Sequence, residues 1–161
     1  MAARSGSARS SKPRKGSTPP LSALDLGIDL GTTRTVVARA DRGNYPVLSF
    51  TDTNGDSHDY YPSLTALTDD GLVHGFRARR AARQGAPLLR SLKRTLAAPS
   101  VSAASPVALG DRTLGVGEVL VSFLTDLRQE LAASGVLDGA DPGGEDANVV
   151  VGKSGPFTMP R

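Results

Sequence analysis

The chain has 161 residues, with 19 lysines and arginines, 16 aspartates and glutamates, and no cysteine. The lack of cysteine excludes disulfides and thiolate metal sites, and no apolar run approaches the roughly 18 residues of a membrane-spanning helix. This length suits one domain, whose core must be built from Leu, Val and Ala because only 4% of the residues are aromatic.

Residues 1–22 differ in composition from the remainder. They hold five basic residues and no acidic one, which leaves 14 basic and 16 acidic residues in the rest of the chain. The segment is rich in Ser, Pro, Arg and Lys and has no apolar periodicity, so we predict a disordered basic leader. It lacks the apolar core of a secretory signal, and we expect it to be solvated rather than bound to a polyanion.

Two strands joined by a tight turn are predicted next. Residues 24–30 are mostly apolar and are followed by a glycine, which is typical of a buried strand. Residues 35–40 begin with β-branched side chains and fit a returning antiparallel strand. Gly31 lies between them, and because it has no Cβ the backbone can turn sharply and a ligand can come close.

The turn carries residues suited to binding phosphate. Successive backbone N–H groups in a turn form an anion-binding concavity, to which the hydroxyls of Thr32 and Thr33 add donors. Asp29 precedes the turn, and a carboxylate there repels phosphate unless a hard cation such as hydrated Mg²⁺ lies between them. The residues alone leave two interpretations open: a phosphate site with Asp29 holding Mg²⁺, or an ordinary hairpin with a solvated aspartate.

Strands precede helices in the rest of the chain, which predicts an α+β arrangement. Further strands are predicted at 45–50, 62–67, 72–73, 107–109, 113–114 and 148–151, the last of them buried. Helices are predicted at 76–84, with four arginines on a solvated face, at 88–96 and at 116–134. His58 and His74 have no partner at metal-ligand spacing, so both are expected at the surface.

Lys93 lies off the leucine stripe of the predicted helix 88–96. Its side chain is therefore expected to point away from the local core, toward a cleft or bulk water. Near a transferred phosphate, a lysine offsets developing charge without acting as a base. The alternative is a surface lysine whose stem lies along apolar neighbours.

Three stretches resemble, in order, the DnaK-type heat-shock chaperones of the actin-like ATPase superfamily. Residues 27–33 (GIDLGTT) resemble the first phosphate loop of that family, and residues 61–67 (YPSLTAL) are similar to the strand that follows its β-meander. Residues 91–96 (SLKRTL) are similar to the segment whose lysine lies near the γ-phosphate. The resemblance runs from about residue 24 to residue 151.

The resemblance implies a mixed α+β, ribonuclease H-like fold: lobe I of an actin-like ATPase, with a five-stranded mixed sheet. It places a helical and hairpin insertion at about 60–115, within a truncated lobe at 23–151, and leaves 152–161 as an irregular, divergent tail. The second lobe and the peptide-binding domain of the family have no counterpart in this sequence. We therefore expect a truncated, frameshifted or split gene, whose 161-residue product hydrolyses no ATP above background.

The same resemblance implies ATP and Mg²⁺ as cofactors of a chaperone ATPase. The implied catalytic residues are Lys93 and Asp29, with Asp29 holding Mg²⁺ through water, and the implied phosphate-binding residues are Gly31, Thr32, Thr33 and Arg34. Arg34 replaces the usual Asn or aromatic residue of the family, where a guanidinium would either strengthen phosphate binding or take the place of the metal. A basic residue of the 76–84 helix, Arg79 or Arg80, would contribute to contacts between lobes.

The implied partners are ATP or ADP, with unfolded client proteins and co-chaperones reached through domains that this sequence lacks. No specific nucleic acid and no membrane are expected, and the implied location is cytoplasmic. Two alternatives stay open. One is another actin-superfamily protein, a filament-forming rod-shape homologue or a sugar kinase, against which the 107–115 hairpin and the Lys93–Arg94 pair count. The other is a non-catalytic, degenerate lobe.

Overall fold

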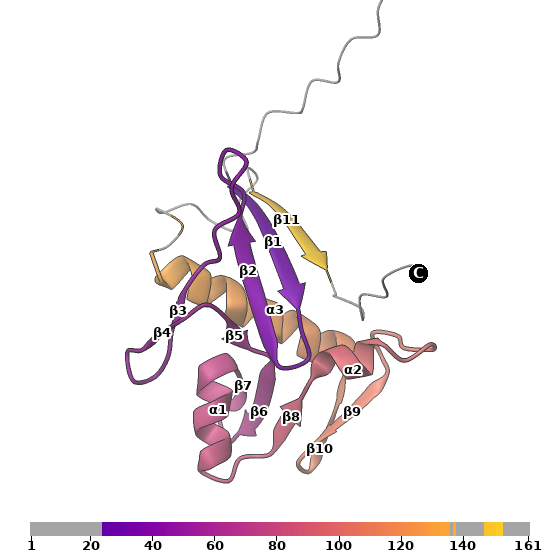
Figure 1. Cartoon of the computed structure of the whole chain (residues 1–161). Helices are drawn as coiled ribbons and strands as arrows, with labels where there is room; N and C mark the ends of the chain where they lie inside the picture. Colours follow the sequence, from indigo (N-terminus) through magenta and orange to yellow (C-terminus); the bar gives the residue numbers. More distant parts are fainter. Residues whose placement is uncertain (1–23, 136, 138–146, 153–161) are drawn as a thin grey trace, which may run out of the picture.

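The structure is a computed structural model that describes residues 24–135, 137 and 147–152 (Figure 1). The predicted leader at 1–22 and residues 153–161 of the predicted tail lie outside the described residues. The fold is a mixture of α and β elements, as predicted. Among the described residues, no helix has the length and apolar character needed to cross a membrane.

The central sheet has the strand order β11-β1-β2-β5. Its strands are β1 (Leu24–Leu30), β2 (Arg34–Arg39), β5 (Tyr61–Pro62) and β11 (Ala147–Gly152). β1 pairs antiparallel with β2 and parallel with β11, so the sheet is mixed, as the resemblance implied. The predicted β1–β2 hairpin is confirmed.

The long helix α3 (Val116–Ala133) covers one face of this sheet (Figure 1). The side chains of β1 alternate between the two faces because successive residues of a strand point in opposite directions. Leu24, Leu26, Ile28 and Leu30 are buried in one cluster with Phe123, Leu127 and Leu131 of α3. Asp29 therefore lies on the opposite face, and it is exposed there.

The expected count of five strands in the central sheet is wrong for the described residues, which give four. The predicted strand at 45–50 supplies only an isolated bridge, between Val47 and Ala38. Pro46 has no N–H to donate to a ladder, although its carbonyl accepts the Arg39 N–H at 3.1 Å. Phe50 instead belongs to β3 (Phe50–Thr51), which pairs with β4 (Ser57–His58) in a separate ribbon.

A second sheet has the order β7-β6-β8 and lies below the central one in Figure 1. It consists of β6 (Leu64–Thr68), β7 (Gly71–His74) and β8 (Leu88–Arg90). The predicted strand at 62–67 is thus divided at Ser63, because β5 pairs within the first sheet and β6 within the second. The helix α1 (Gly75–Arg83) connects β7 to the segment that leads into β8, close to its predicted limits.

The predicted helix at 88–96 is wrong in its first half. Residues Leu88–Arg90 form β8, paired with β6, and only Leu92–Leu96 form a helix, α2. A short apolar run fits a strand and a helix equally well, and here the hydrogen-bonded pairing with β6 makes residues 88–90 a strand. The predicted hairpin and long helix are confirmed as β9 (Pro106–Leu109), β10 (Arg112–Gly115) and α3.

The predicted burial of strand 148–151 is also wrong. β11 lies at the edge of the central sheet, with β1 as its neighbour. Its valines are 40%, 63% and 50% exposed at positions 149, 150 and 151. An apolar run predicts burial from composition, whereas actual burial depends on what lies beside the strand.

Candidate phosphate-binding site

The connection between β1 and β2 is the tight turn predicted at Gly31. The Gly31 N–H donates to the carbonyl of Arg34 at 3.1 Å and closes the turn. A Cβ on Gly31 would lie 2.2 Å from the Arg34 carbonyl oxygen, a distance that real Cβ atoms do not reach. The chain itself therefore requires glycine here, whether or not a ligand approaches.

Thr32 and Thr33 form the exposed tip of this turn. Across the described residues, neither backbone N–H donates to a backbone carbonyl. Two successive unpaired amides with two adjacent hydroxyls match the donor set of an anion-binding turn. Such a set of donors suits a phosphate group, which accepts several hydrogen bonds.

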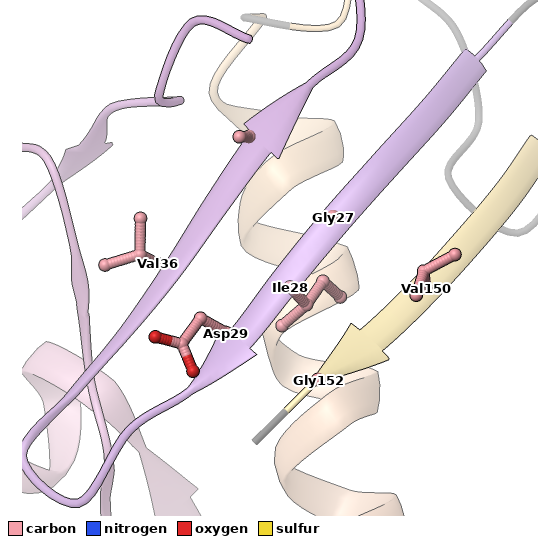
Figure 2. Close-up of a pocket in the computed structure, with 7 residues that line it drawn as sticks. Gly27, Ile28, Asp29, Val36, Val150 and Gly152 are labelled. Atoms are coloured by element: carbon pink, nitrogen blue, oxygen red, sulfur yellow. The ribbon is translucent and has the colours of Figure 1, made fainter. Parts of the chain in front are cut away.

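Asp29 is the charged group nearest the turn on β1. It lines an open hollow of about 430 Å³ on the sheet face opposite α3, together with Gly27, Val36, Val150 and Gly152 (Figure 2). Within the described ranges no other acidic residue lines this hollow, and no three His, Cys, Asp or Glu residues group as metal ligands. Mg²⁺ tolerates such a site because it keeps several waters and uses one or two carboxylates.

The structure places Arg34 against an aromatic ring beside the turn. Its Cζ lies 4.4 Å from the centroid of the Tyr60 ring, a cation–π geometry. Tyr60 is half-buried and its ring centroid lies 6.0 Å from that of Phe76. Stacking leaves the guanidinium edge able to donate, but Arg34 does not line the hollow around Asp29.

Backbone hydrogen bonds connect the turn to the segment that carries Lys93. The Ser63 N–H donates to the Thr33 carbonyl at 3.1 Å, and the Ser63 carbonyl accepts the Ser91 N–H at 3.4 Å. These two bonds place the three stretches that carry the family resemblance side by side, with Ser63 in the middle. Lys93 follows two residues later, half-buried in α2. It does not line the hollow around Asp29.

Sequence reasoning missed the buried carboxylate of Asp126, on α3. Asp126 is 6% exposed and accepts hydrogen bonds from the Tyr61 hydroxyl and from Arg77. Burial, together with this hydrogen bond, raises the pKa of Tyr61. The sequence does contain a signal for this buried carboxylate, because Asp126 follows Phe123 by three residues and so lies on the apolar stripe of α3. Its partner Arg77 is exposed, as predicted for a solvated face, and its guanidinium also pairs with the Asp126 carboxylate.

A second carboxylate, Asp52, holds the β3–β4 ribbon against α1. Its Oδ2 accepts from Arg79 Nη2 at 3.0 Å and lies 3.3 Å from His58 Nε2. Hydrogen bonds from the backbone N–H groups of Asn54 and Asp56 lower the pKa of the Asp52 carboxyl. Arg79, which the resemblance implied at a contact between lobes, is thus paired within this chain.

The surface position predicted for His74 is wrong, since this residue is 2% exposed. Its Nδ1 lies 3.0 Å from Thr65 Oγ1 and its Nε2 lies 2.8 Å from Ser122 Oγ. His74 ends β7 on the inward side and so joins that strand to α3. Burial lowers the pKa of His74, against the opposing effect of the Asp126 charge.

Acidification is expected to destabilise the fold through His74. Because its folded pKa is lowered, the unfolded chain binds the proton at a higher pH. The contribution of neutral His74 to the free energy of unfolding is therefore fully present above the unfolded pKa of about 6.5, and it is lost as the pH falls below that value. Urea unfolding between pH 5 and pH 8 measures this loss, and His74→Gln should flatten the pH dependence. His58→Gln is the matched control; an unchanged slope in His74→Gln would exclude His74 as the cause.

No family model and no curated protein matches this sequence. The residues of the turn and of β1 supply the chemistry of the site. Within the described ranges the Thr32 and Thr33 amides donate to no backbone carbonyl, two threonine hydroxyls lie next to them in the sequence, and the exposed Asp29 precedes the turn. Amides and hydroxyls attract anions, and a single carboxylate suits a hydrated divalent cation. A phosphate group bound together with a metal ion matches both features, the phosphate facing the amides and hydroxyls and the metal facing the carboxylate.

Proposed function

We propose that this chain is the N-terminal part of an ATP-dependent chaperone of the DnaK type, a lobe I fragment of its actin-like ATPase domain. In this proposal the Gly31–Arg34 turn binds the phosphates of ATP or ADP. The observation that carries it is that, among the described residues, neither the Thr32 nor the Thr33 N–H donates to a backbone carbonyl, in a turn that begins two residues after the exposed Asp29. Mg²⁺ would lie between Asp29, through water, and the phosphate oxygens, whose charge it neutralises.

The link through Ser63 supports a role for Lys93 at the same site. Its ammonium would offset charge on the terminal phosphate, a contribution that depends on position rather than on proton transfer. Arg34 would add hydrogen bonds from the edge of its guanidinium, which lies over the Tyr60 ring. The order β9–β10 hairpin followed by α3 supports the DnaK type over a filament protein or a sugar kinase.

The proposed partners follow from the family. They are unfolded client proteins and co-chaperones in the cytoplasm. One observation favours a second candidate, a non-catalytic lobe: Lys93 does not line the hollow around Asp29. Binding without hydrolysis would suit that candidate.

A titration with Mg·ATP followed by amide NMR tests the proposal. The Thr32 and Thr33 amide resonances are expected to shift, and Asp29→Asn should weaken the Mg²⁺-dependent binding by about tenfold, because it removes the anionic ligand of the metal. Asp25→Asn is the control, since Asp25 precedes Asp29 by four residues on the same strand. Equal Mg·ATP affinity in Asp29→Asn would remove Asp29 from the site, and unmoved Thr32 and Thr33 resonances would refute phosphate binding.

A further inference from the structure

Ser91 combines two unfavourable features between β8 and α2. Its backbone is left-handed, with φ 65° and ψ 67°, a conformation that residues other than glycine, asparagine and aspartate seldom adopt. The residue is 5% exposed, and within the described part of the chain its buried hydroxyl has no hydrogen-bond partner. Both features cost free energy, and such strain concentrates at functional sites.

Helix capping does not explain this serine. Ser91 occupies the N-cap position of α2, but its side chain makes no capping hydrogen bond. A capping serine normally has an extended backbone and accepts a bond from the second or third helical N–H. Ser91 therefore holds the chain in shape through its backbone and not through its hydroxyl.

The left-handed backbone converts a strand into a helix within one residue. On one side of Ser91, β8 pairs with β6; on the other, its carbonyl accepts the Arg94 N–H at 3.0 Å and opens α2. The direction in which α2 leaves the sheet is thus decided at Ser91. Lys93 is the second residue of that helix, so the backbone at Ser91 also sets the direction in which the Lys93 side chain leaves the main chain.

The same residue is anchored to the candidate phosphate site. Its N–H donates to the Ser63 carbonyl, and the Ser63 N–H donates to the Thr33 carbonyl. The strained residue is consequently fixed two hydrogen bonds away from the turn. A conformation that is costly by itself persists where the surrounding structure determines it.

We infer that Ser91 is a positioning residue of the phosphate site, whose left-handed backbone directs Lys93 toward the Gly31–Arg34 turn. This inference rests on the proposed function. It assigns a role to a residue that makes no contact with phosphate, and it explains why a strained backbone interrupts an otherwise regular strand–helix junction. The left-handed backbone, and not the hydroxyl, is the feature that Lys93 needs.

Five variants test the role of the Ser91 backbone against that of its hydroxyl, with Mg·ATP affinity measured by the same NMR titration. Ser91→Gly keeps the left-handed backbone easily and should bind within twofold of the wild type. Ser91→Thr disfavours that backbone and should weaken binding about tenfold, as Lys93→Ala should. The double variant Ser91→Thr/Lys93→Ala should show no further loss, because both changes remove one contribution. Arg42→Thr is the matched control: Arg42 also has a positive φ, 47°, in an exposed turn.

A measurement on the wild type does not depend on whether Ser91→Thr folds. Mn²⁺·ATP should broaden the ε-methylene resonance of Lys93, because a paramagnetic ion relaxes nearby protons. Shifts at Thr32 and Thr33 without broadening at Lys93 would overturn the inference and leave the proposed function standing. Full affinity in a folded Ser91→Thr would do the same. The absence of any shift at Thr32 and Thr33 would overturn both.

Discussion

Replacing Gly75 by alanine is expected to lower the free energy of unfolding by about 2–5 kcal/mol. Gly75 opens α1 with φ +59°, and a Cβ there would lie 2.0 Å from Cζ of the Tyr61 ring. The ring cannot move aside, because it packs against Phe50, with centroids 5.3 Å apart, and against Phe123, at 5.8 Å. The left-handed backbone costs an alanine about 1–2 kcal/mol and overpacking costs about 1–3 kcal/mol. Urea unfolding measures the sum.

Gly135→Ala separates these two costs. Gly135 has φ +72° and no atom within 4 Å of an added Cβ, so alanine there meets only the backbone penalty. We expect a loss of about 1–2 kcal/mol in that variant. Equal losses in Gly75→Ala and Gly135→Ala would contradict a steric role for Tyr61.

The parts of the fold that sequence predicted well are those where local signals and tertiary packing agree. The helical stripe of α3 is long, and its positions Phe123, Leu127 and Leu131 are all buried against the sheet. The β1–β2 hairpin is marked by a glycine turn between two apolar segments. Each of these elements carries its own period over its full length, so no distant partner was needed to identify it.

The predictions were wrong where the secondary structure or the burial of a residue depends on segments that are distant in the sequence. Leu88 and Leu89 fit a helical stripe, yet they form a strand because β6, more than twenty residues earlier, pairs with them. Val150 is apolar but 63% exposed, since nothing among the described residues covers the edge on which it lies. Composition cannot reveal either fact.

The features of the candidate site were likewise predicted where they are local in sequence and missed where they are not. The turn at Gly31 and the exposed Asp29 were predicted, because a tight turn is encoded by neighbouring residues. The link from Thr33 through Ser63 to Ser91 was not, since it consists of backbone hydrogen bonds between distant segments. The left-handed backbone of Ser91 has no signature in its residue type.

Replacing Asp126 by alanine is expected to cost about 2–3 kcal/mol of stability. The change leaves the buried Tyr61 hydroxyl without its acceptor and Arg77 without its main ion pair. Breaking a buried pair costs about 3–5 kcal/mol, but the Arg77 side chain is 50% exposed and regains water, which lowers the expected loss. Asp126→Asn retains an acceptor for Tyr61 and should lose less than alanine does.

Glu130→Ala is the control for Asp126, because Glu130 is 38% exposed and lies 3.8 Å from the same guanidinium. A pair exposed to this degree contributes about 1 kcal/mol at most. Tyr61 also belongs to β5, which pairs with Thr35 of β2 immediately after the turn. Asp126 therefore holds the strand that supports the Gly31–Arg34 turn, and Asp126→Ala should reduce the protection of the Thr35 amide from hydrogen exchange as well as global stability. Equal losses in Asp126→Ala and Glu130→Ala would show that the buried hydrogen bond to Tyr61 contributes nothing beyond a surface ion pair.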